Sequence, residues 1–174
     1  MQELATGRNT YDAQRKREMQ ALLAVDDAVA QVLGALTDTG RVDDTLIVFA
    51  SDNGTSARSH RWGGKMTVWE EAIRIPLVMR YDPLTGGVGR IDDSHLALNL
   101  DLAPTIAELA GVAPAGAEGA SLVPFLDGTP QSWRDRFLIA HLTDGRSPPS
   151  YCAVRTTRYK RVCAIPWVRK SCTT

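Results

Sequence analysis

The chain has 174 residues, of which 44% are hydrophobic and 23% charged. This composition is typical of a soluble globular protein, with enough residues for one ordinary domain or a large piece of a bigger one. Lys plus Arg and Asp plus Glu number 20 each, so the formal net charge is zero. A balanced charge provides no long-range attraction to nucleic acid or to anionic lipid, and we expect neither as a partner.

No apolar run in the sequence approaches the roughly 20 residues of a membrane span. The first ten residues lack the apolar core of a signal peptide. The three cysteines are Cys152, Cys163 and Cys172. An odd number without a framework spacing argues against a disulfide scaffold, and no pair has the spacing of a zinc site. These observations predict a reduced compartment, with the cytoplasm as the default location.

The first predicted element is one long amphipathic helix from about Tyr11 to Thr37. Its apolar residues recur at helical spacing and form a single stripe. They are Met19, Leu22, Val25, Val29, Val32, Leu33 and Leu36. Gly40 follows the last periodic residue and suits the end of a helix.

The next element is the apolar run Thr45 to Ala50, which has polar residues on both sides. Its length and its branched side chains predict a strand buried on both faces, as in a parallel sheet. A helix followed by a buried strand is half of a βαβ unit without its first strand. The sequence therefore predicts an α/β fold.

A polar, glycine-bearing loop of functional length is predicted from Ser51 to Lys65. Five short elements are predicted after it. They are helices at 67–74, 102–110 and 122–126 and strands at 76–81 and 95–100. Asp101 is placed as the N-cap of the 102–110 helix, and Gly111 lies at the end of that helix.

From Trp133 onward the pattern changes to short strands. They are predicted at 137–142, 151–155 and 159–163, and such spacing is typical of a small antiparallel sheet. The predicted organisation is therefore an α/β portion at residues 1–132 and the start of an antiparallel subdomain at residues 133–174.

The main candidate functional residues, Asp52 and Asn53, lie in the loop after the first predicted strand. In open α/β sheets ligands bind beyond the carboxyl ends of strands, which is where these two residues fall. A carboxylate and an amide oxygen are the hard donors that calcium and magnesium prefer. Gly54 would let the backbone turn sharply behind them. Taken alone, an Asp-Asn-Gly sequence is also a common turn.

Eleven residues after Gly54 the chain reaches Lys65, directly after Gly63 and Gly64. Two glycines permit close approach of the backbone, and a lysine ammonium binds a tetrahedral anion as a point charge. His60 could donate to a substrate oxygen or act as an acid. The alternative for each side chain is a solvated surface residue.

Several ordered stretches together resemble the type I sulfatase family of the alkaline phosphatase superfamily, and the resemblance covers roughly residues 11–162. The stretches lie in the second half of that family's catalytic domain and in its C-terminal subdomain. They are Thr45–Gly54, Gly64-Lys65, Glu70–Val78, Asn99–Thr105, Ala110–Val112, Ser121-Leu122 and Tyr151–Lys160.

The resemblance implies a partial alkaline-phosphatase-like α/β sandwich and the hydrolysis of sulfate esters on a small molecule or glycan. It further implies that Asp52 and Asn53 bind a metal, calcium with magnesium as the alternative, and that Lys65 contacts the sulfate. His60 is placed as a further substrate contact. Glu70 and Arg74 stand one helical turn apart, and the spacing predicts a bracing ion pair between them.

Other parts of the family pattern are not found in this sequence. Sulfatases use a formylglycine made from a Cys/Ser-x-Pro-x-Arg motif, and no such motif occurs here. The family's N-terminal Asp pair, which completes the metal site, has no counterpart, and the tail after Val162 departs from the family. We therefore expect this chain to be inactive alone, with a missing N-terminal half or a second copy as its partner. The alternatives are a phosphodiesterase or phosphonate hydrolase of the same superfamily, or a non-catalytic interaction fragment.

Overall fold

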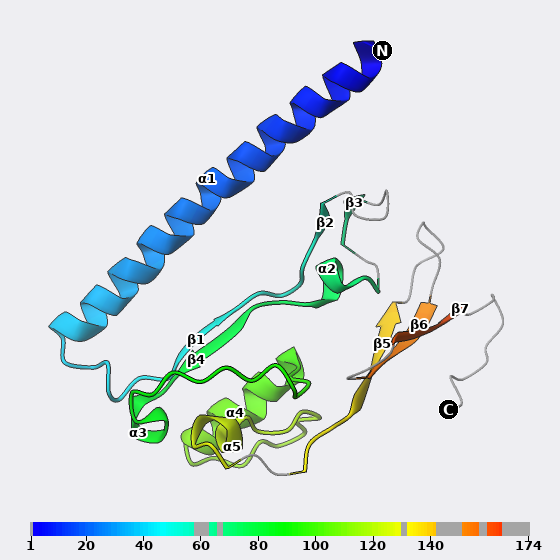
Figure 1. Ribbon diagram of the computed structural model, residues 1–174. Coiled ribbons are helices and arrows are strands. Elements are labelled where there is room, and N and C mark those ends of the chain that lie inside the picture. The colour runs from blue at the N-terminus through cyan, green and yellow to red at the C-terminus, as the bar shows by residue number, and fades with distance from the viewer. Residues whose placement is uncertain are drawn as a thin grey trace. The chain divides into compact units, whose positions relative to one another are not determined.

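The computed structural model describes residues 2–57, 63–65, 68–129, 132–141, 151–156 and 160–164. The chain divides into two compact units, Met1–Thr45 and Leu46–Thr174. Each unit is described by itself below, with the elements labelled as in Figure 1.

The first unit consists of one long helix, α1 (Gln2–Asp38), and the turn that ends it. The predicted helix is confirmed, and it begins nine residues before the predicted start at Tyr11. Gly40 ends it with a φ of 64°, in the left-handed region that favours glycine. Arg41 N then donates to Leu36 O at 2.8 Å, which satisfies a carbonyl of the last turn.

One part of α1, Tyr11–Asp38, is long and apolar enough to cross a membrane by length and composition. The sequence had predicted no such segment. A helix that packs in the core of a soluble protein passes the same test. Asp26 and Asp27 lie near the middle of this segment. Because a carboxylate at the centre of a bilayer costs about 2.5–3.5 kcal/mol, the pair favours an amphipathic helix over a membrane span.

The second unit begins with two strands that lie side by side, β1 (Ile47–Ala50) and β4 (Leu77–Arg80) (Figure 1). Both strands were predicted. They pair antiparallel, with Ile47 opposite Arg80 and Ala50 opposite Leu77. The expected parallel pairing is wrong for the described residues, since every strand pairing among them is antiparallel.

The expected burial of β1 on both faces is also wrong. Ile47 and Val48 are half-buried, whereas Phe49 is 43% exposed. Among the described strands β1 pairs only with β4, so it lies in a two-stranded sheet and not in a larger one. An apolar run reports the hydrophobicity of a strand and carries no information on which neighbours the chain supplies.

Short elements connect these two strands and follow them. β2 (Ser56–Ala57) pairs with β3 (Gly63–Gly64), and α2 (Glu70–Ile73) is a shorter form of the helix predicted at 67–74. α3 (Asp82–Thr85) follows β4 and ends at Gly86, whose φ is 59°.

The predicted helices near residues 102–110 and 122–126 are confirmed as α4 (Leu102–Leu109) and α5 (Val123–Leu126). Gly111 ends α4 with a φ of 71°, as its position in the sequence suggested. The strand predicted at 95–100 is wrong. The chain there is irregular and enters the short 3-10 helix η2 (Asn99–Asp101).

Asp101 explains this difference, because its side chain organises the surrounding backbone. The residue is 0% exposed. Its carboxylate accepts from Leu98 N at 2.8 Å and from Ala120 N at 2.9 Å. Both carboxylate oxygens also accept from the guanidinium of Arg134, with Nη2 2.7 Å from Oδ1. Asp101 precedes α4 as predicted but makes no side-chain cap bond to it, so the predicted capping role is wrong.

Two further contacts fasten the segment before α5 to the start of α4. Thr105 is fully buried, and its Oγ1 accepts from Leu122 N at 2.8 Å. A Cβ on Gly119 would lie 2.1 Å from Leu100 O, so only glycine permits this approach of the two backbones.

The last described part is a three-stranded antiparallel sheet in the order β5-β6-β7. Its strands are β5 (Arg136–His141), β6 (Tyr151–Thr156) and β7 (Lys160–Ala164). The predicted C-terminal antiparallel strands are thus confirmed. The proposed boundary between residues 132 and 133 stays a prediction.

We predict that Arg134→Met destabilises the chain by about 3–5 kcal/mol, because it leaves the buried Asp101 carboxylate without its cation. Urea unfolding of the purified chain measures the change. Arg136→Met is the matched control. It breaks the ion pair between Arg136 and Asp135, whose side chains are 68% and 67% exposed, and such an exposed pair contributes little to stability. Equal effects of the two substitutions would contradict the role assigned to Asp101.

Candidate functional site

The turn after β1 is fixed by its own side chains. Ser51 Oγ donates to Asn53 O at 2.9 Å, and Asn53 N donates to Asp52 Oδ1 at 2.8 Å. The amide nitrogen of the Asn53 side chain donates to Gly54 O at 3.0 Å. Because Nδ2 is held by the backbone, the orientation of the Asn53 amide is set and its Oδ1 faces away from Gly54.

Asn53 and Lys65 are brought together by the fold. Lys65 Nζ donates to Asn53 Oδ1 at 3.0 Å, across twelve positions of sequence. The Asp52 carboxylate, beside Asn53 in the chain, is exposed. Two of the predicted site residues therefore touch, and a carboxylate adjoins them. His60 lies outside the described residues.

The glycines of this region have roles different from those expected. Gly54 N donates to Ala72 O at 2.9 Å, and a Cβ on Gly54 would lie 2.2 Å from Glu71 O. Gly54 is therefore required for close approach to α2 and not for a sharp turn. Gly64 has open space around it but a φ of 100°. Its requirement is conformational, and it turns the chain just before Lys65.

The hairpin that carries Lys65 holds a buried hydroxyl. Ser56, in β2, is 1% exposed, and its Oγ has no hydrogen-bond partner in the part of the chain that the structure describes. Ser56 lies directly opposite Gly64 in the β2–β3 pairing. Buried side-chain hydroxyls are normally paired, so this one is a distinctive feature of the hairpin.

An ion pair links the C-terminal sheet to α2. Arg155 Nε, in β6, lies 3.1 Å from Glu70 Oε1. The predicted pair of Glu70 with Arg74 is therefore replaced by a pair with a residue far along the chain. Helix α2 stops at Ile73 and Arg74 is extended, with a ψ of 118°, so its side chain leaves the helical face of Glu70.

The Asp52–Asn53 turn, α2 and the C-terminal sheet border one open groove of about 1210 Å³. Asp52, Asn53, Glu70 and Arg155 line it, with Asp92, Asp93, His95 and apolar residues of β4, β5 and the segment 96–102. Lys65 is not among the residues that line this groove. The groove therefore carries carboxylate, amide and guanidinium groups along an apolar floor, as a site for a polar ligand requires.

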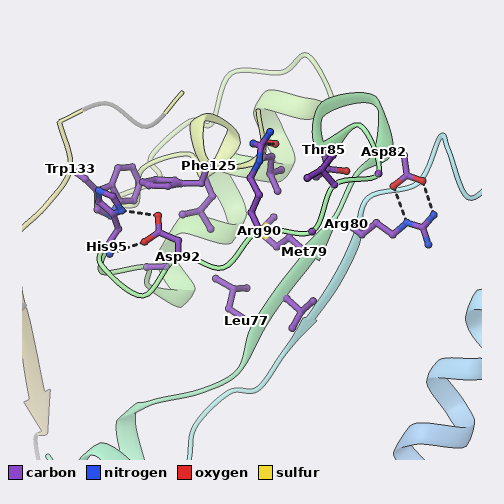
Figure 2. A pocket seen from close by; sticks show the side chains of 17 residues that line it. Leu77, Met79, Arg80, Asp82, Thr85, Arg90, Asp92, His95, Phe125 and Trp133 are labelled. Atoms are coloured by element: carbon purple, nitrogen blue, oxygen red, sulfur yellow. Dashed lines mark hydrogen bonds and ion pairs between the residues drawn. The ribbon is translucent and has the colours of Figure 1, made fainter. Parts of the chain in front are cut away.

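A second hollow, of about 650 Å³, was not predicted (Figure 2). Leu77 and Met79 of β4 line it, with Phe125 and Trp133 opposite. The Phe125 and Trp133 rings meet edge-on, with centroids 4.7 Å apart and planes at 83°. Met79 and Phe125 are 46 positions apart, and residues so distant in sequence share no periodic signal, so sequence patterns could not reveal this hollow.

Asp92 and His95 border the same hollow. His95 Nδ1 lies 2.7 Å from Asp92 Oδ2, and the His95 ring packs on Phe125 with a centroid distance of 5.0 Å. Burial raises the pKa of the Asp92 carboxyl, but hydrogen bonds from His95 and Ser94 outweigh burial and lower that pKa overall. Both Ser94 Oγ and Asp92 contact the same ring nitrogen, so the three do not form a relay through the two nitrogens of His95.

Asp52 and Asn53 fit a divalent cation as two ligands of a larger set. Their oxygens are the donor type that calcium prefers, and Asn53 Oδ1 already accepts from a cationic group, the Lys65 ammonium. Calcium takes roughly six to eight oxygens. Among the described residues no group of three or more His, Cys, Asp or Glu side chains could hold a metal. The two residues fit part of a metal site and not a whole one.

Comparison with known families decides the affiliation of the chain. The Sulfatase family model matches residues 3–112, and the model of the N-sulphoglucosamine sulphohydrolase C-terminal region matches residues 58–168. The chain belongs to the sulfatase family. Its similarity to an alkaline phosphatase superfamily sulfatase, expected from the sequence, is thereby confirmed.

Individual relatives agree with this affiliation. An N-acetylglucosamine-6-O-sulfatase of Bacteroides thetaiotaomicron is 37% identical over 128 residues, 71% of this chain and 23% of the relative. A solved structure in complex with D-glucosamine-2-N,6-O-disulfate has a TM-score of 0.75 and 31% identity, covering 86% of this chain and 31% of that one. The phosphonate monoester hydrolase of Agrobacterium radiobacter has a TM-score of 0.70 and 29% identity, covering 80% and 31%.

Two facts follow for this sulfatase-family chain. It spans about 23% of the length of the Bacteroides thetaiotaomicron relative. Its likeness to sulfatase structures confirms the predicted partial α/β fold of the alkaline phosphatase type. The antiparallel strands described above are thus one portion of that larger fold.

We predict that Gly54→Ala destabilises the purified chain by about 1–3 kcal/mol, the usual cost of overpacking. The new methyl group would collide with Glu71 O and separate the Asp52–Asn53 turn from α2. Gly89→Ala is the control, because Gly89 has open space around it and a φ outside the left-handed region. Urea unfolding of both variants measures the difference. A Gly54→Ala variant as stable as Gly89→Ala would refute the close approach.

Proposed function

We propose that this chain is the metal-and-sulfate half of a sulfuric ester hydrolase. Asp52 and Asn53 serve as ligands of a calcium ion, with magnesium as the alternative, and Lys65 binds the sulfate group. The observation that carries this proposal is the 3.0 Å contact of Lys65 Nζ with Asn53 Oδ1, which places an ammonium beside a candidate metal ligand. The sulfatase names of the relatives give the reaction class.

Residues of this chain suit two tasks of this reaction, binding the anionic ester and neutralising the charge that develops on it. A bound calcium would polarise the sulfate oxygens. Lys65 carries one positive charge on a flexible stem, so its ammonium can move from Asn53 to an oxygen of the ester. There it neutralises charge that develops on the sulfate and on the leaving oxygen. The buried Ser56 hydroxyl, in the same hairpin, supports a polar role for this part of the fold.

The nucleophile, in this proposal, is supplied from outside these 174 residues. In a sulfatase it is a formylglycine from a Cys/Ser-x-Pro-x-Arg motif, which this sequence does not contain. One carboxylate also leaves most of the charge of a divalent cation unneutralised. The chain alone therefore provides binding groups for a sulfate ester and no attacking group. His60 remains a proposed substrate contact.

A phosphonate or phosphodiester hydrolase is the second candidate. The likeness to the Agrobacterium radiobacter phosphonate monoester hydrolase favours it. Sulfate and phosphonate groups are both tetrahedral and anionic, and the described half-site offers the same ammonium and oxygens to either. The identity of the nucleophile discriminates between them.

Self-association is the third candidate, and exposed apolar side chains on the β1–β4 pair favour it. Phe49 and Val78 lie opposite each other and are 43% and 61% exposed. Paired strands with exposed apolar residues offer a surface for association. The partner would be a second copy of this chain or a protein that supplies the rest of the sulfatase fold.

We predict no sulfate release when the purified chain is mixed with a chromogenic aryl sulfate, with or without calcium. The reason is the missing nucleophile. Product absorbance, followed for hours at micromolar chain, measures the rate, and an intact arylsulfatase is the control. Sustained turnover by the chain would show that it contains a complete site.

A chimera tests the assigned residues. In it this chain replaces the matching segment of the Bacteroides thetaiotaomicron relative, which then supplies the nucleophile. We expect Lys65→Ala to lower kcat/KM for an aryl sulfate by about 10²–10³, the usual loss of one transition-state donor. Asp52→Ala should abolish the dependence of the rate on calcium.

Lys16→Ala is the matched control for the chimera, because Lys16 is an exposed lysine of α1. It should leave kcat/KM unchanged. An unchanged kcat/KM for Lys65→Ala would remove Lys65 from the site. Because the chimera takes its nucleophile from a sulfatase, it tests the roles of these residues and not the ester class of the second candidate.

A further inference from the structure

Two of the three cysteines are directly opposite each other in the C-terminal sheet. The β6–β7 pairing sets Cys152 against Cys163, between the pairs Tyr151–Ala164 and Ala153–Val162. They lie eleven positions apart in the sequence. Neither was expected to pair, because an odd number of cysteines without a framework spacing suggested free thiols.

This register position meets the Cα requirement of a disulfide. Directly opposite residues of an antiparallel pair have Cα atoms about 4.5 or 5.5 Å apart, depending on the hydrogen-bonding pattern. A disulfide joins Cα atoms that are about 4.4–6.8 Å apart, so both kinds of opposite position fall inside the Cα range. The Cβ atoms of such residues are about 4.5–5.5 Å apart, and a disulfide draws them to about 3.5–4.5 Å.

The neighbouring strand shows the exposure of one part of this face. Ala140 of β5 lies opposite Cys152, so Ala140, Cys152 and Cys163 occupy one row of register positions across the three strands. Ala140 is exposed, and so is Leu138, two residues earlier on the same face of β5. The part of this face that β5 contributes is therefore open to solvent.

We infer that Cys152 and Cys163 form a reversible cross-strand disulfide, made by exchange with a small-molecule disulfide such as oxidised glutathione. One cysteine thiolate attacks the small disulfide and releases one small thiol, which leaves a mixed disulfide on the chain. The second thiolate attacks the mixed disulfide and releases the second small thiol. Two protein thiols are oxidised by two electrons, one small disulfide is reduced, and the two protons end on the released thiols.

The bond would fasten β7 to β6, the strand that carries Arg155 and its ion pair with Glu70. Because β7 pairs with β6 alone among the described strands, the bond would join the edge of the sheet to its centre. Oxidation is therefore expected to hold the sheet together and reduction to free its edge.

Peptide mapping of the full chain tests this inference. The reduced chain is incubated with oxidised glutathione in native buffer, free thiols are alkylated, and trypsin is added. Trypsin separates the three cysteines, with Cys152 in peptide 147–155, Cys163 in 162–169 and Cys172 in 171–174. We expect the main cross-linked species to join 147–155 to 162–169, with the loss of two hydrogen atoms.

The control is the same reaction in concentrated urea. In the unfolded chain Cys163 and Cys172, nine positions apart, close a shorter loop than Cys152 and Cys163 do, so their link should gain share. Cys172→Ser should leave the native link intact, and Cys152→Ser and Cys163→Ser should abolish it. The inference is overturned if native buffer and urea give the same map, if the main link includes Cys172, or if glutathione adducts form without a cross-link.

Discussion

The buried carboxylate of Asp101 is the interaction on which the second unit depends. One side chain accepts from the backbone before η2, from the backbone before α5 and from the guanidinium that precedes β5. A carboxylate removed from water is stable only when its oxygens are paired, so these three segments must meet around it. Trp133 strengthens the same junction, since its indole donates to Leu96 O at 2.8 Å and its ring lies 4.6 Å beneath the Arg134 guanidinium.

Contacts lead from this junction to the candidate site. Arg134 fixes the chain just before β5, and β5 pairs with β6, which carries Arg155. Arg155 meets Glu70 of α2, and the same short helix receives the Gly54 amide through Ala72 O. The turn that holds Asp52 and Asn53 is therefore supported by parts of the chain more than eighty residues away. The position of this turn is thus tied through α2 to the C-terminal sheet.

The sequence predicted the helices and strands of this chain better than it predicted how they pair and pack with one another. Helices α1, α4 and α5 were found because apolar periodicity and terminal glycines are local signals. The strand expected at 95–100 was wrong because Asp101 draws Leu98 N into a turn, an interaction that depends on Arg134, 33 positions further on. Parallel pairing was wrong for a similar reason: an apolar run shows only that a strand is hydrophobic. Which strand pairs with it, and what covers it, depends on other parts of the chain.

For the site, the motif Asp-Asn-Gly and the later Lys65 were identifiable from residue type and order, and the structure brings Asn53 and Lys65 into contact. The physical reasons for the glycines were not identifiable. Gly54 is required because a neighbouring carbonyl leaves no room for a Cβ, and Gly64 is required because of its positive φ. The sequence alone does not distinguish these two causes. The pair formed by Glu70 and Arg155 was equally hidden, because helical spacing pointed to Arg74.

The choice of an amide at position 53 has a consequence for Lys65. An amide carries no net charge, so withdrawing the ammonium from it separates no pair of opposite ions. A carboxylate at the same place would hold the lysine by Coulomb attraction as well as by a hydrogen bond. Asn53 thus keeps the lysine oriented, and this contact leaves the positive charge of the ammonium unneutralised.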